Sequence, residues 1–407
     1  MAQKTPLDRR GFMRIAGTYG LTPTLYAVAG VVGPLTLEGV GNAAAQTAAA
    51  RSGPAAVTLK FGASGFNEAN LKIQESGQIW FAQEVEKRSN GAIKVDFIGS
   101  NAICNQGDCV KKAQQGIVDL FSASTQNSAG SAPYYNVLDF AYMFPNRASM
   151  HHFFYSKKSE KLFREPMRRL HNIQFLFTHC EQRGLMLGKK WDDKPLITSV
   201  DQLAGTKNRV TGTQLGRIAM TLMQLNPVPI AWEETLDGLK QGLIDGAETW
   251  MGAAAYANMV PVLSQAVDLR FFAGTEHTAM NLTSFQKKLT PVQQDLMMEV
   301  AYDAQQYTQR EQERALVEIV GAEPNPRPDT LFAKNKIRVA VLSDAELTKA
   351  EKMCSPEFQP KPWEEWRERL NKMSGGSDVY KEIYAIAREI PLNATVPSVK
   401  PNRWWKS

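Results

Sequence analysis

Polar and aromatic side chains follow several of the predicted strands of this 407-residue chain, at the points where those strands end. In open parallel sheets, ligands collect beyond the carboxyl ends of the strands, where helix N-termini present unpaired N–H groups and the positive end of the helix dipole. Such an edge favours the binding of an anion. The candidate binding residues are Ser64-Gly65-Phe66-Asn67 and Ser124-Thr125-Gln126 in the first half, and Arg209, Trp232 and Glu248-Thr249-Trp250 in the second.

The elements that would position these residues occur twice along the chain. A short motif, Gln115-Gly116-Ile117-Val118-Asp119, returns as Gln241-Gly242-Leu243-Ile244-Asp245. The first copy ends a predicted series of strand 57–63, helix 70–89, strand 93–98, helix 106–115 and strand 117–123. The second copy ends a series of strand 207–211, helix 213–224, strand 227–230, helix 232–241 and strand 243–247. Strands that alternate with helices predict mainly parallel sheets, so we expect an α/β protein with two β-α-β-α-β lobes and a cleft between them.

A long helix and a tail follow the second lobe. Thr290-Pro291 supplies the N-cap and N1 residues that favour a helix start, and apolar positions continue this helix to about residue 320. At about 1.5 Å per residue the helix would measure about 45 Å, so we expect it to cross both lobes. We place the first lobe at 46–181 and 273–320, the second at 182–272, and a C-terminal helical region packed on the lobes at 321–407.

The first 45 residues differ from the rest of the chain. Arg9-Arg10-Gly11-Phe12-Met13 precedes a moderately apolar run that closes on Ala43-Ala44-Ala45, which is the pattern of a twin-arginine export signal, residues 1–45. A membrane anchor is the alternative, but Glu38 and five glycines make this run a poor membrane span. We therefore expect an exported mature chain that is not embedded in a membrane.

Export would bring the four cysteines into an oxidising compartment, where disulfides form. Cys104 and Cys109 lie close enough in the sequence to clip a short loop. Cys180 and Cys354 could pair across a long loop, although the sequence does not give the distance between them. Structural zinc at Cys104 and Cys109 is disfavoured, because no second pair of ligands has the required spacing.

Charge and motifs disfavour several other classes of protein. The net charge of +6 is spread along the chain without the basic stripe of a nucleic-acid-binding protein, so no nucleic-acid partner is expected. The five histidines lack metal-ligand spacing. The nucleophile elbow, the zincin motif, the P-loop and the dinucleotide motif are absent from the sequence. We therefore predict no catalytic residue, metal or cofactor, and an exported enzyme with a scattered site is the less favoured alternative.

Several runs of residues resemble a known family. The clearest are Gly205-Thr206-Lys207-Asn208-Arg209-Val210, Pro227-Val228-Pro229-Ile230-Ala231-Trp232-Glu233-Glu234 and Gly242-Leu243-Ile244-Asp245-Gly246-Ala247-Glu248. Others are Gly99-Ser100-Asn101, Val137-Leu138-Asp139-Phe140-Ala141-Tyr142-Met143-Phe144 and Leu289-Thr290-Pro291. Over roughly residues 57–321 the chain resembles the periplasmic solute-binding proteins of TRAP transporters, the dicarboxylate-binding (DctP) family.

The resemblance implies a two-lobe periplasmic-binding-protein fold that closes around one small organic acid and offers it, in the periplasm, to a membrane permease. In that family an arginine at the position of Arg209 forms a salt bridge with the ligand carboxylate, and a second arginine, matched here by Arg183, lies beside it. Arginine suits this role because its planar fork donates two parallel hydrogen bonds to a carboxylate. A ligand sensor for a receptor kinase would share the fold and the site, and an exported enzyme acting on organic acids is the more distant alternative.

The chain departs from the family pattern directly after Glu248. Many relatives have Asn-Pro at the next two positions, whereas this chain has Thr249 and Trp250, so a hydroxyl and an indole replace the amide. With Phe66 and Trp232, Trp250 would form a wall suited to a ligand with an apolar or aromatic body. Some relatives hold a metal cation beside the substrate with a carboxylate and a tryptophan, so a cation at Glu248 stays an open alternative.

Overall fold

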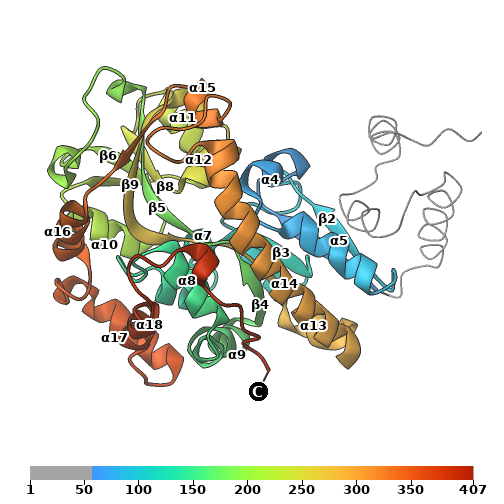
Figure 1. Cartoon of the computed structure of the whole chain (residues 1–407). Coiled ribbons are helices and arrows are strands. Elements are labelled where there is room, and N and C mark those ends of the chain that lie inside the picture. The colour runs from blue at the N-terminus through green and yellow to red at the C-terminus, as the bar shows by residue number, and fades with distance from the viewer. Residues whose placement is uncertain (1–56, 407) are drawn as a thin grey trace, which may run out of the picture. The chain divides into compact units, whose positions relative to one another are not determined.

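The computed structural model describes residues 57–406 (Figure 1). The predicted twin-arginine leader therefore lies outside the described residues. Within 57–406, none of the helices combines the length and the apolar character that crossing a membrane requires.

The first lobe is built on a five-stranded sheet with the strand order β2-β1-β3-β10-β4. Its strands are β1 Val57–Ala63, β2 Ile93–Ile98, β3 Leu120–Ser124, β4 Ile173–Thr178 and β10 Glu276–Asn281. Strand β1 pairs in parallel with β2 and β3, and β10 runs antiparallel to β3 and β4. The helices of its predicted repeat are α4 Glu68–Gln74, α5 Gln78–Arg88 and α6 Cys109–Gln114.

The second lobe is built on a six-stranded sheet with the order β11-β9-β5-β8-β6-β7. Its strands are β5 Glu181–Gly188, β6 Lys207–Val210, β7 Asn226–Pro229, β8 Gly246–Thr249, β9 Leu263–Gly274 and β11 Arg338–Val341. Strand β6 pairs in parallel with β7 and β8, whereas β5 runs antiparallel to β8 and β9. Its repeat carries α10 Gln214–Leu222 and α11 Thr235–Lys240, and α12 Met251–Tyr256 follows β8. The two-lobe α/β fold is confirmed, but each sheet is mixed rather than mainly parallel as predicted.

The repeated motif plays the same part in both lobes. In each copy the aspartate makes two hydrogen bonds to the backbone of one lysine in the neighbouring strand. The Asp119 carboxylate accepts a bond from the Lys60 N–H at 3.0 Å, and its own N–H donates to the Lys60 carbonyl at 2.9 Å. Asp245 makes the corresponding bonds to Lys207, at 2.9 and 2.6 Å. The motif thus sets the register between the last strand of each repeat and a parallel partner.

Both closing strands begin later than the sequence predicts. We expected strands from Ile117 and Leu243, but these side chains are 46% and 58% exposed, and β3 and β8 start three residues further on. The preceding glycines, Gly116 and Gly242, have positive φ angles of 74° and 70°. This left-handed conformation ends each helix and turns the next apolar residue outward before the strand begins.

The single helix predicted for 70–89 is also wrong, because the chain breaks between α4 and α5. Glu75 has a left-handed φ of 52°, and Gly77 has a φ of 83°. A Cβ atom on Gly77 would lie 3.0 Å from the Thr308 methyl group, so glycine also permits close packing there. The predicted helix 232–241 begins as a 3-10 turn, Trp232–Glu234, before α11.

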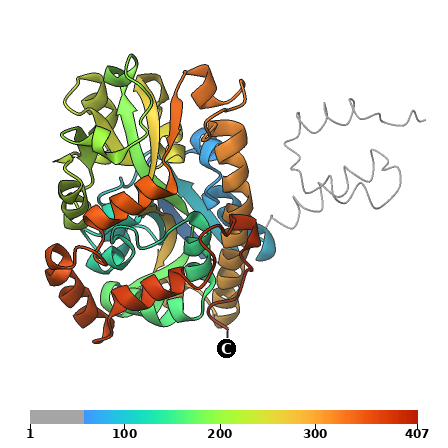
Figure 2. The same ribbon diagram turned by 60° about the vertical axis from the view of Figure 1, so that its left-hand side comes forward.

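The long helix, α14 Pro291–Ala315, runs past both sheets (Figures 1 and 2). It starts at Thr290, as predicted, where a capping box forms, and it continues as a π-helical turn to Val320. Two glutamine side chains of α14 bond the segment where the chain crosses from β4 to β5. Gln305 bonds both backbone groups of Thr178, and Gln312 bonds both of Cys180. The helix therefore supplies hydrogen bonds to the backbone of this segment, as a paired strand would.

The C-terminal region packs on both lobes. Helix α16 Asp344–Cys354 contacts α10 of the second lobe, whereas α18 Val379–Ala387 contacts α8 Arg147–Tyr155 of the first. Strand β11 pairs with β9, so the region contributes a strand as well as the helices expected for 321–407. Cys180 and Cys354 are both free and buried, and the pairing considered from the sequence does not form.

Candidate functional site

The second sheet brings both candidate arginines to one edge. Strand β8 lies between β5, which carries Arg183, and β6, which carries Arg209. Gly184 faces Thr249 across the β5–β8 pair, and Arg209 faces Ala247 across the β6–β8 pair. The end of β8 therefore lies between the two guanidinium groups.

Arg183 is buried and paired with a carboxylate. Its side chain is 1% exposed, and Nη1 donates to both carboxylate oxygens of Glu248, at 3.1 and 3.2 Å. Its Nε donates to the Ala273 carbonyl, and the guanidinium lies 4.6 Å from the centre of a Trp250 ring. Arg183 and Glu248 thus form a buried ion pair whose charges cancel.

Arg209 is equally buried but has no carboxylate partner among residues 57–406. Its Nε donates to the Ile230 carbonyl at 3.1 Å and its Nη1 to the Glu248 carbonyl at 3.3 Å. Its Nη2 is buried without any hydrogen-bond partner. Burial lowers the pKa of Arg209 to about 10, so the group stays protonated at neutral pH. Trp232 lies under this guanidinium, 5.3 Å from it.

A small cavity separates these groups from the loops of the first lobe. Its volume is about 10 Å³, which is room for roughly one water molecule. The lining residues are Gln106, Ser124 and Asn127 from the first lobe and Arg183, Arg209, Trp232, Thr249, Trp250 and Tyr256 from the second. Because both lobes form its walls, an acid with several heavy atoms needs the lobes or the side chains to move apart.

Some of the residues predicted from the sequence lie away from this cavity. Phe66 packs against Tyr256 in the core, with ring centres 4.7 Å apart, and does not line the cavity. Gln126 is buried and bonds Asp139 and Thr211. Glu248 lies behind the cavity, where it pairs with Arg183. The structure does bring together Arg183, Arg209, Trp232, Thr249 and Trp250.

Three lining residues, Gln106, Asn127 and Tyr256, were not singled out from the sequence, whereas Ser124 was among the strand-end candidates. Asn127 directly follows the strand-end run Ser124-Thr125-Gln126, and Gln126 lines the adjoining groove rather than this cavity. Gln106 lies between Cys104 and Cys109, whose short separation in the sequence predicts a loop constrained by a disulfide. Tyr256, on α12, carried no sequence signal.

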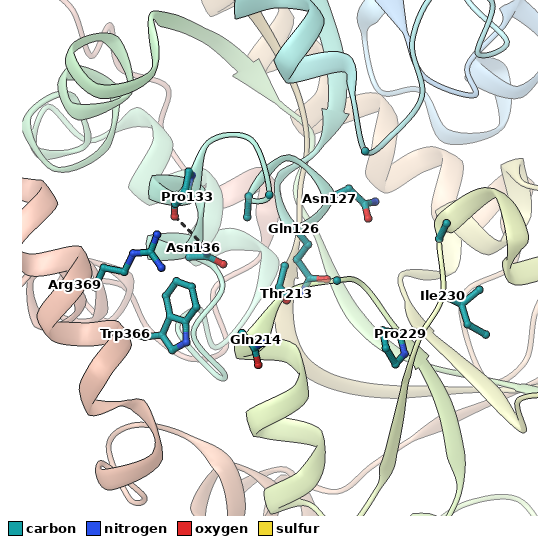
Figure 3. Close-up of a pocket in the computed structure, with 15 residues that line it drawn as sticks. Gln126, Asn127, Pro133, Asn136, Thr213, Gln214, Pro229, Ile230, Trp366 and Arg369 are labelled. Atoms are coloured by element: carbon teal, nitrogen blue, oxygen red, sulfur yellow. Dashed lines mark hydrogen bonds between the residues drawn. The ribbon is translucent and has the colours of Figure 1, made fainter.

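A larger groove of about 520 Å³ adjoins the cavity, and Asn127 lines both. It is formed by loops of the first lobe, by Gly212 to Gln214 and Pro229 to Ala231 of the second, and by α17 Glu364–Ser374. Figure 3 shows Trp366 and Arg369, both from α17, beside Pro133 and Asn136. The C-terminal region therefore forms part of the rim of the interlobe space.

Buried carboxyl groups surround the arginines without neutralising them. Burial raises the pKa of Glu276 to about 8, and Gln106 Nε2 and Ser122 Oγ bond this side chain. Burial likewise raises the pKa of Asp139 to about 8. With pKa values near 8, both groups are mostly neutral at pH 7, and Glu248 pairs with Arg183 alone. The charge of Arg209 has no salt-bridge partner among residues 57–406.

The donor set around Glu248 does not favour a cation. Both oxygens of Glu248 face Arg183, so a metal ion there would compete with a guanidinium. The one group of possible metal ligands among residues 57–406 is Cys104, Asp108 and Cys109. Cys104 and Cys109 are joined in a disulfide, which removes both thiolates as ligands.

Comparison with known proteins gives a consistent family. A family model described as DctP, bacterial extracellular solute-binding protein, family 7, matches residues 65–359. Protein YiiZ of Salmonella typhimurium, itself uncharacterized, is 24% identical over 260 residues, which is 59% of this chain and 73% of that protein.

Solved structures show the same fold at low sequence identity. A TRAP periplasmic solute-binding protein from Ralstonia eutropha with bound (S)-2-acetolactate superposes with a TM-score of 0.66 at 17% identity. A TRAP periplasmic solute-binding protein from Anaerococcus prevotii with bound D-glucuronate gives the same TM-score and identity. In both comparisons the match covers 82% of this chain and 99% of the other.

Proposed function

Since the chain belongs to the DctP family of bacterial extracellular solute-binding proteins, we propose that it captures a small organic acid between its lobes and delivers it, in the periplasm, to the permease of a TRAP transporter. Solute binding is the function of the family. Our proposal adds the class of ligand, the residues that hold it, the compartment and the permease partner.

The observation that carries the proposal is the unpaired charge of Arg209. A buried guanidinium without a carboxylate is costly, because water no longer solvates the charge. Its unbonded Nη2 belongs to a residue that lines the cavity. A ligand carboxylate would supply both the missing counter-charge and the missing hydrogen-bond acceptor.

Two further unpaired groups define the rest of the ligand. Thr249 Oγ1 and Trp250 Nε1 are buried without partners, and both residues line the cavity. Each can donate a hydrogen bond to an oxygen atom. We therefore propose an acid that carries a hydroxyl or oxo oxygen near its carboxylate, with Trp232 and Tyr256 against its carbon skeleton. The acids bound by the two structural relatives, acetolactate and glucuronate, have this chemistry.

Lobe closure would complete the site. Loops of the two lobes are joined by hydrogen bonds from Thr211 Oγ1 to Gln126 and from the Gln106 N–H to Glu233, both at 3.1 Å. Opening would break these bonds and admit the acid. Closure then removes water from around the carboxylate and strengthens its attraction to Arg209. The ligand shifts the equilibrium because it contacts both lobes only in the closed state.

A thermal-shift comparison of matched ligands tests the proposal. We expect D-glucuronate, 2-acetolactate or a related hydroxy or oxo acid to raise the melting temperature, because ligands that bind the folded state stabilise it. The uncharged amide D-glucuronamide is the control for D-glucuronate, and benzoate tests the apolar wall. Equal stabilisation by the acid and its amide, or no stabilisation by any carboxylate, would contradict the proposal.

A further inference from the structure

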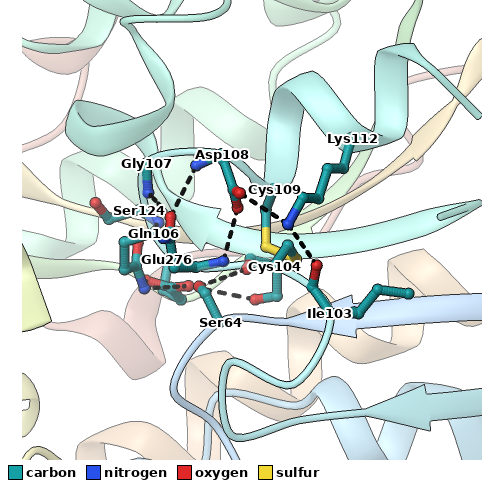
Figure 4. Close-up of a disulfide and its surroundings, with 12 residues drawn as sticks. Ser64, Ile103, Cys104, Gln106, Gly107, Asp108, Cys109, Lys112, Ser124 and Glu276 are labelled. Atoms are coloured by element: carbon teal, nitrogen blue, oxygen red, sulfur yellow. Dashed lines mark hydrogen bonds and ion pairs between the residues drawn. A yellow bond between two sulfur atoms is a disulfide. The ribbon is translucent and has the colours of Figure 1, made fainter. Parts of the chain in front are cut away.

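A disulfide-closed loop carries Gln106 from the first lobe to the cavity (Figure 4). Cys104 and Cys109 are joined across five positions, and both are buried. The disulfide packs against β1 at Gly62, where an added Cβ atom would lie 2.8 Å from Cys104 Sγ. The loop is therefore held from behind by a strand of the first sheet.

Hydrogen bonds inside the loop fix its course. Asn105 Oδ1 accepts bonds from the N–H groups of Gly107 and Asp108, and the Asp108 carboxylate accepts from the Asn105 N–H. Lys112 bonds the Ile103 carbonyl at 2.7 Å and pairs with Asp108 at 2.8 Å. Since these bonds use the groups around it, Gln106 is the loop residue left to face the other lobe.

Gln106 bonds both lobes at once. Its N–H donates to Glu233 Oε1 of the second lobe at 3.1 Å. In the first lobe its Oε1 accepts from the Ser124 N–H at 2.8 Å, and its Nε2 donates to Glu276 at 3.3 Å. The side chain is 2% exposed and forms part of the cavity wall beside Arg183 and Arg209.

We propose that Gln106 is a positioning residue for ligand capture, and that the Cys104–Cys109 disulfide holds it where its N–H ties the first lobe to Glu233 of the second. Three consequences follow from this geometry. The loop is a latch of the closed state, loss of the link speeds ligand release, and a change at the exposed Glu233 acts on the cavity through Gln106. The effect on ligand release rests on the proposed function, whereas the link between the lobes stands without a ligand.

Hydrogen exchange on the ligand-free full-length protein tests the link directly. Glu233→Ala removes the acceptor of the Gln106 N–H, and Glu234→Ala is the matched control, because Glu234 is an exposed neighbour without a bond to the loop. We expect the Gln106 amide to exchange about tenfold faster in Glu233→Ala, the factor for one hydrogen bond of ordinary strength. The rate stays unchanged in Glu234→Ala, and Glu233→Gln, which keeps an acceptor oxygen, restores most of the protection.

The disulfide is tested with the Cys104→Ala/Cys109→Ala variant. We expect it to speed exchange at Gln106 as Glu233→Ala does, and the combination to add little, because both changes break the same link. Glu233→Ala leaves the disulfide intact, so the proposal stays testable if the cysteine variant fails to fold. Unchanged exchange in Glu233→Ala, or additive effects in the combination, would overturn the proposal.

Ligand release separates this proposal from the proposed function. With D-glucuronate as the probe, we expect Glu233→Ala to raise the dissociation rate about tenfold and to leave the association rate nearly unchanged. A general loss of structure would lower the melting temperature of the ligand-free protein strongly, whereas the loss of one hydrogen bond in Glu233→Ala is expected to lower it only slightly. If the unchanged protein does not bind D-glucuronate, that result counts against this ligand. The exchange rates of the Gln106 amide still test the link between Gln106 and Glu233.

Discussion

Arg183 and Arg209 lie at one edge of the same sheet, both are buried, and each lies over a tryptophan, yet their electrostatic surroundings differ. Arg183 pairs with Glu248 through both carboxylate oxygens. Arg209 has two backbone carbonyls and an unbonded nitrogen. The difference supports the proposal that Arg183 holds the site together and that Arg209 binds the ligand.

Glu248 links the two roles. Its side chain neutralises Arg183, while its backbone carbonyl accepts a bond from Arg209. One residue therefore fixes the position of both guanidinium groups but compensates the charge of only one. A second ionised carboxylate at this place would cancel the charge that attracts an acid.

The largest expected effect is the loss of stability when Arg183 is replaced. Arg183→Met leaves Glu248 buried without its counter-charge, so we expect the free energy of unfolding to fall by about 3–5 kcal/mol. Urea denaturation measures this change. The double variant Arg183→Met/Glu248→Gln removes both charges and is expected to recover most of the loss. A decrease below about 1 kcal/mol for Arg183→Met alone would show that the pair is not structural.

Arg209→Met is expected to show the opposite pattern. The ligand carboxylate loses its only unpaired guanidinium, so the binding free energy of an acid found in the ligand screen falls by about 2–5 kcal/mol. The ligand-free protein keeps its stability, because no carboxylate is left unpaired by the change. Calorimetry measures the first effect and urea denaturation the second.

Arg217→Met is the matched control for Arg209→Met, since Arg217 is exposed on α10 of the same lobe. Unchanged affinity in Arg209→Met would remove this residue from the binding site. A loss of stability as large as that of Arg183→Met would show that the two arginines do not differ in role.

The sequence predicted the fold well because its signals are local and repeated. The motif with Asp119 and Asp245 marks equivalent places in two lobes, and Thr290-Pro291 marks the start of the long helix. The errors arose where a backbone conformation overrides a periodic pattern. The apolar period runs through Glu75, but its left-handed conformation and that of Gly77 end the first helix there.

The site was harder to predict because partner choice depends on three-dimensional distances. The sequence singled out Arg183, Arg209 and Glu248, but not that the glutamate pairs with one arginine and leaves the other unpaired. Phe66 was placed by strand-end position alone, yet its ring turns into the core against Tyr256. Gln106 lines the cavity from a loop closed by a disulfide, and no sequence periodicity reports such a contact.

The smallest expected effect concerns the charge of Glu276, which lies behind Gln106. Burial raises its folded-state pKa to about 8 from the ordinary 4.5, so the stability that this group contributes is present below pH 4.5 and is lost as pH rises through 8. Ionisation also adds a negative charge near Arg183, beside the proposed place of the ligand carboxylate. We therefore expect the affinity for a carboxylate ligand to fall by up to about tenfold between pH 7 and pH 9, as it would if the bound anion raised the pKa of Glu276 by about one further unit.

Calorimetry at both pH values measures this effect, and Glu276→Gln is expected to abolish it. A pH dependence that persists in Glu276→Gln would assign the titration to another group, of which Asp139, with its pKa also near 8, is the first to replace.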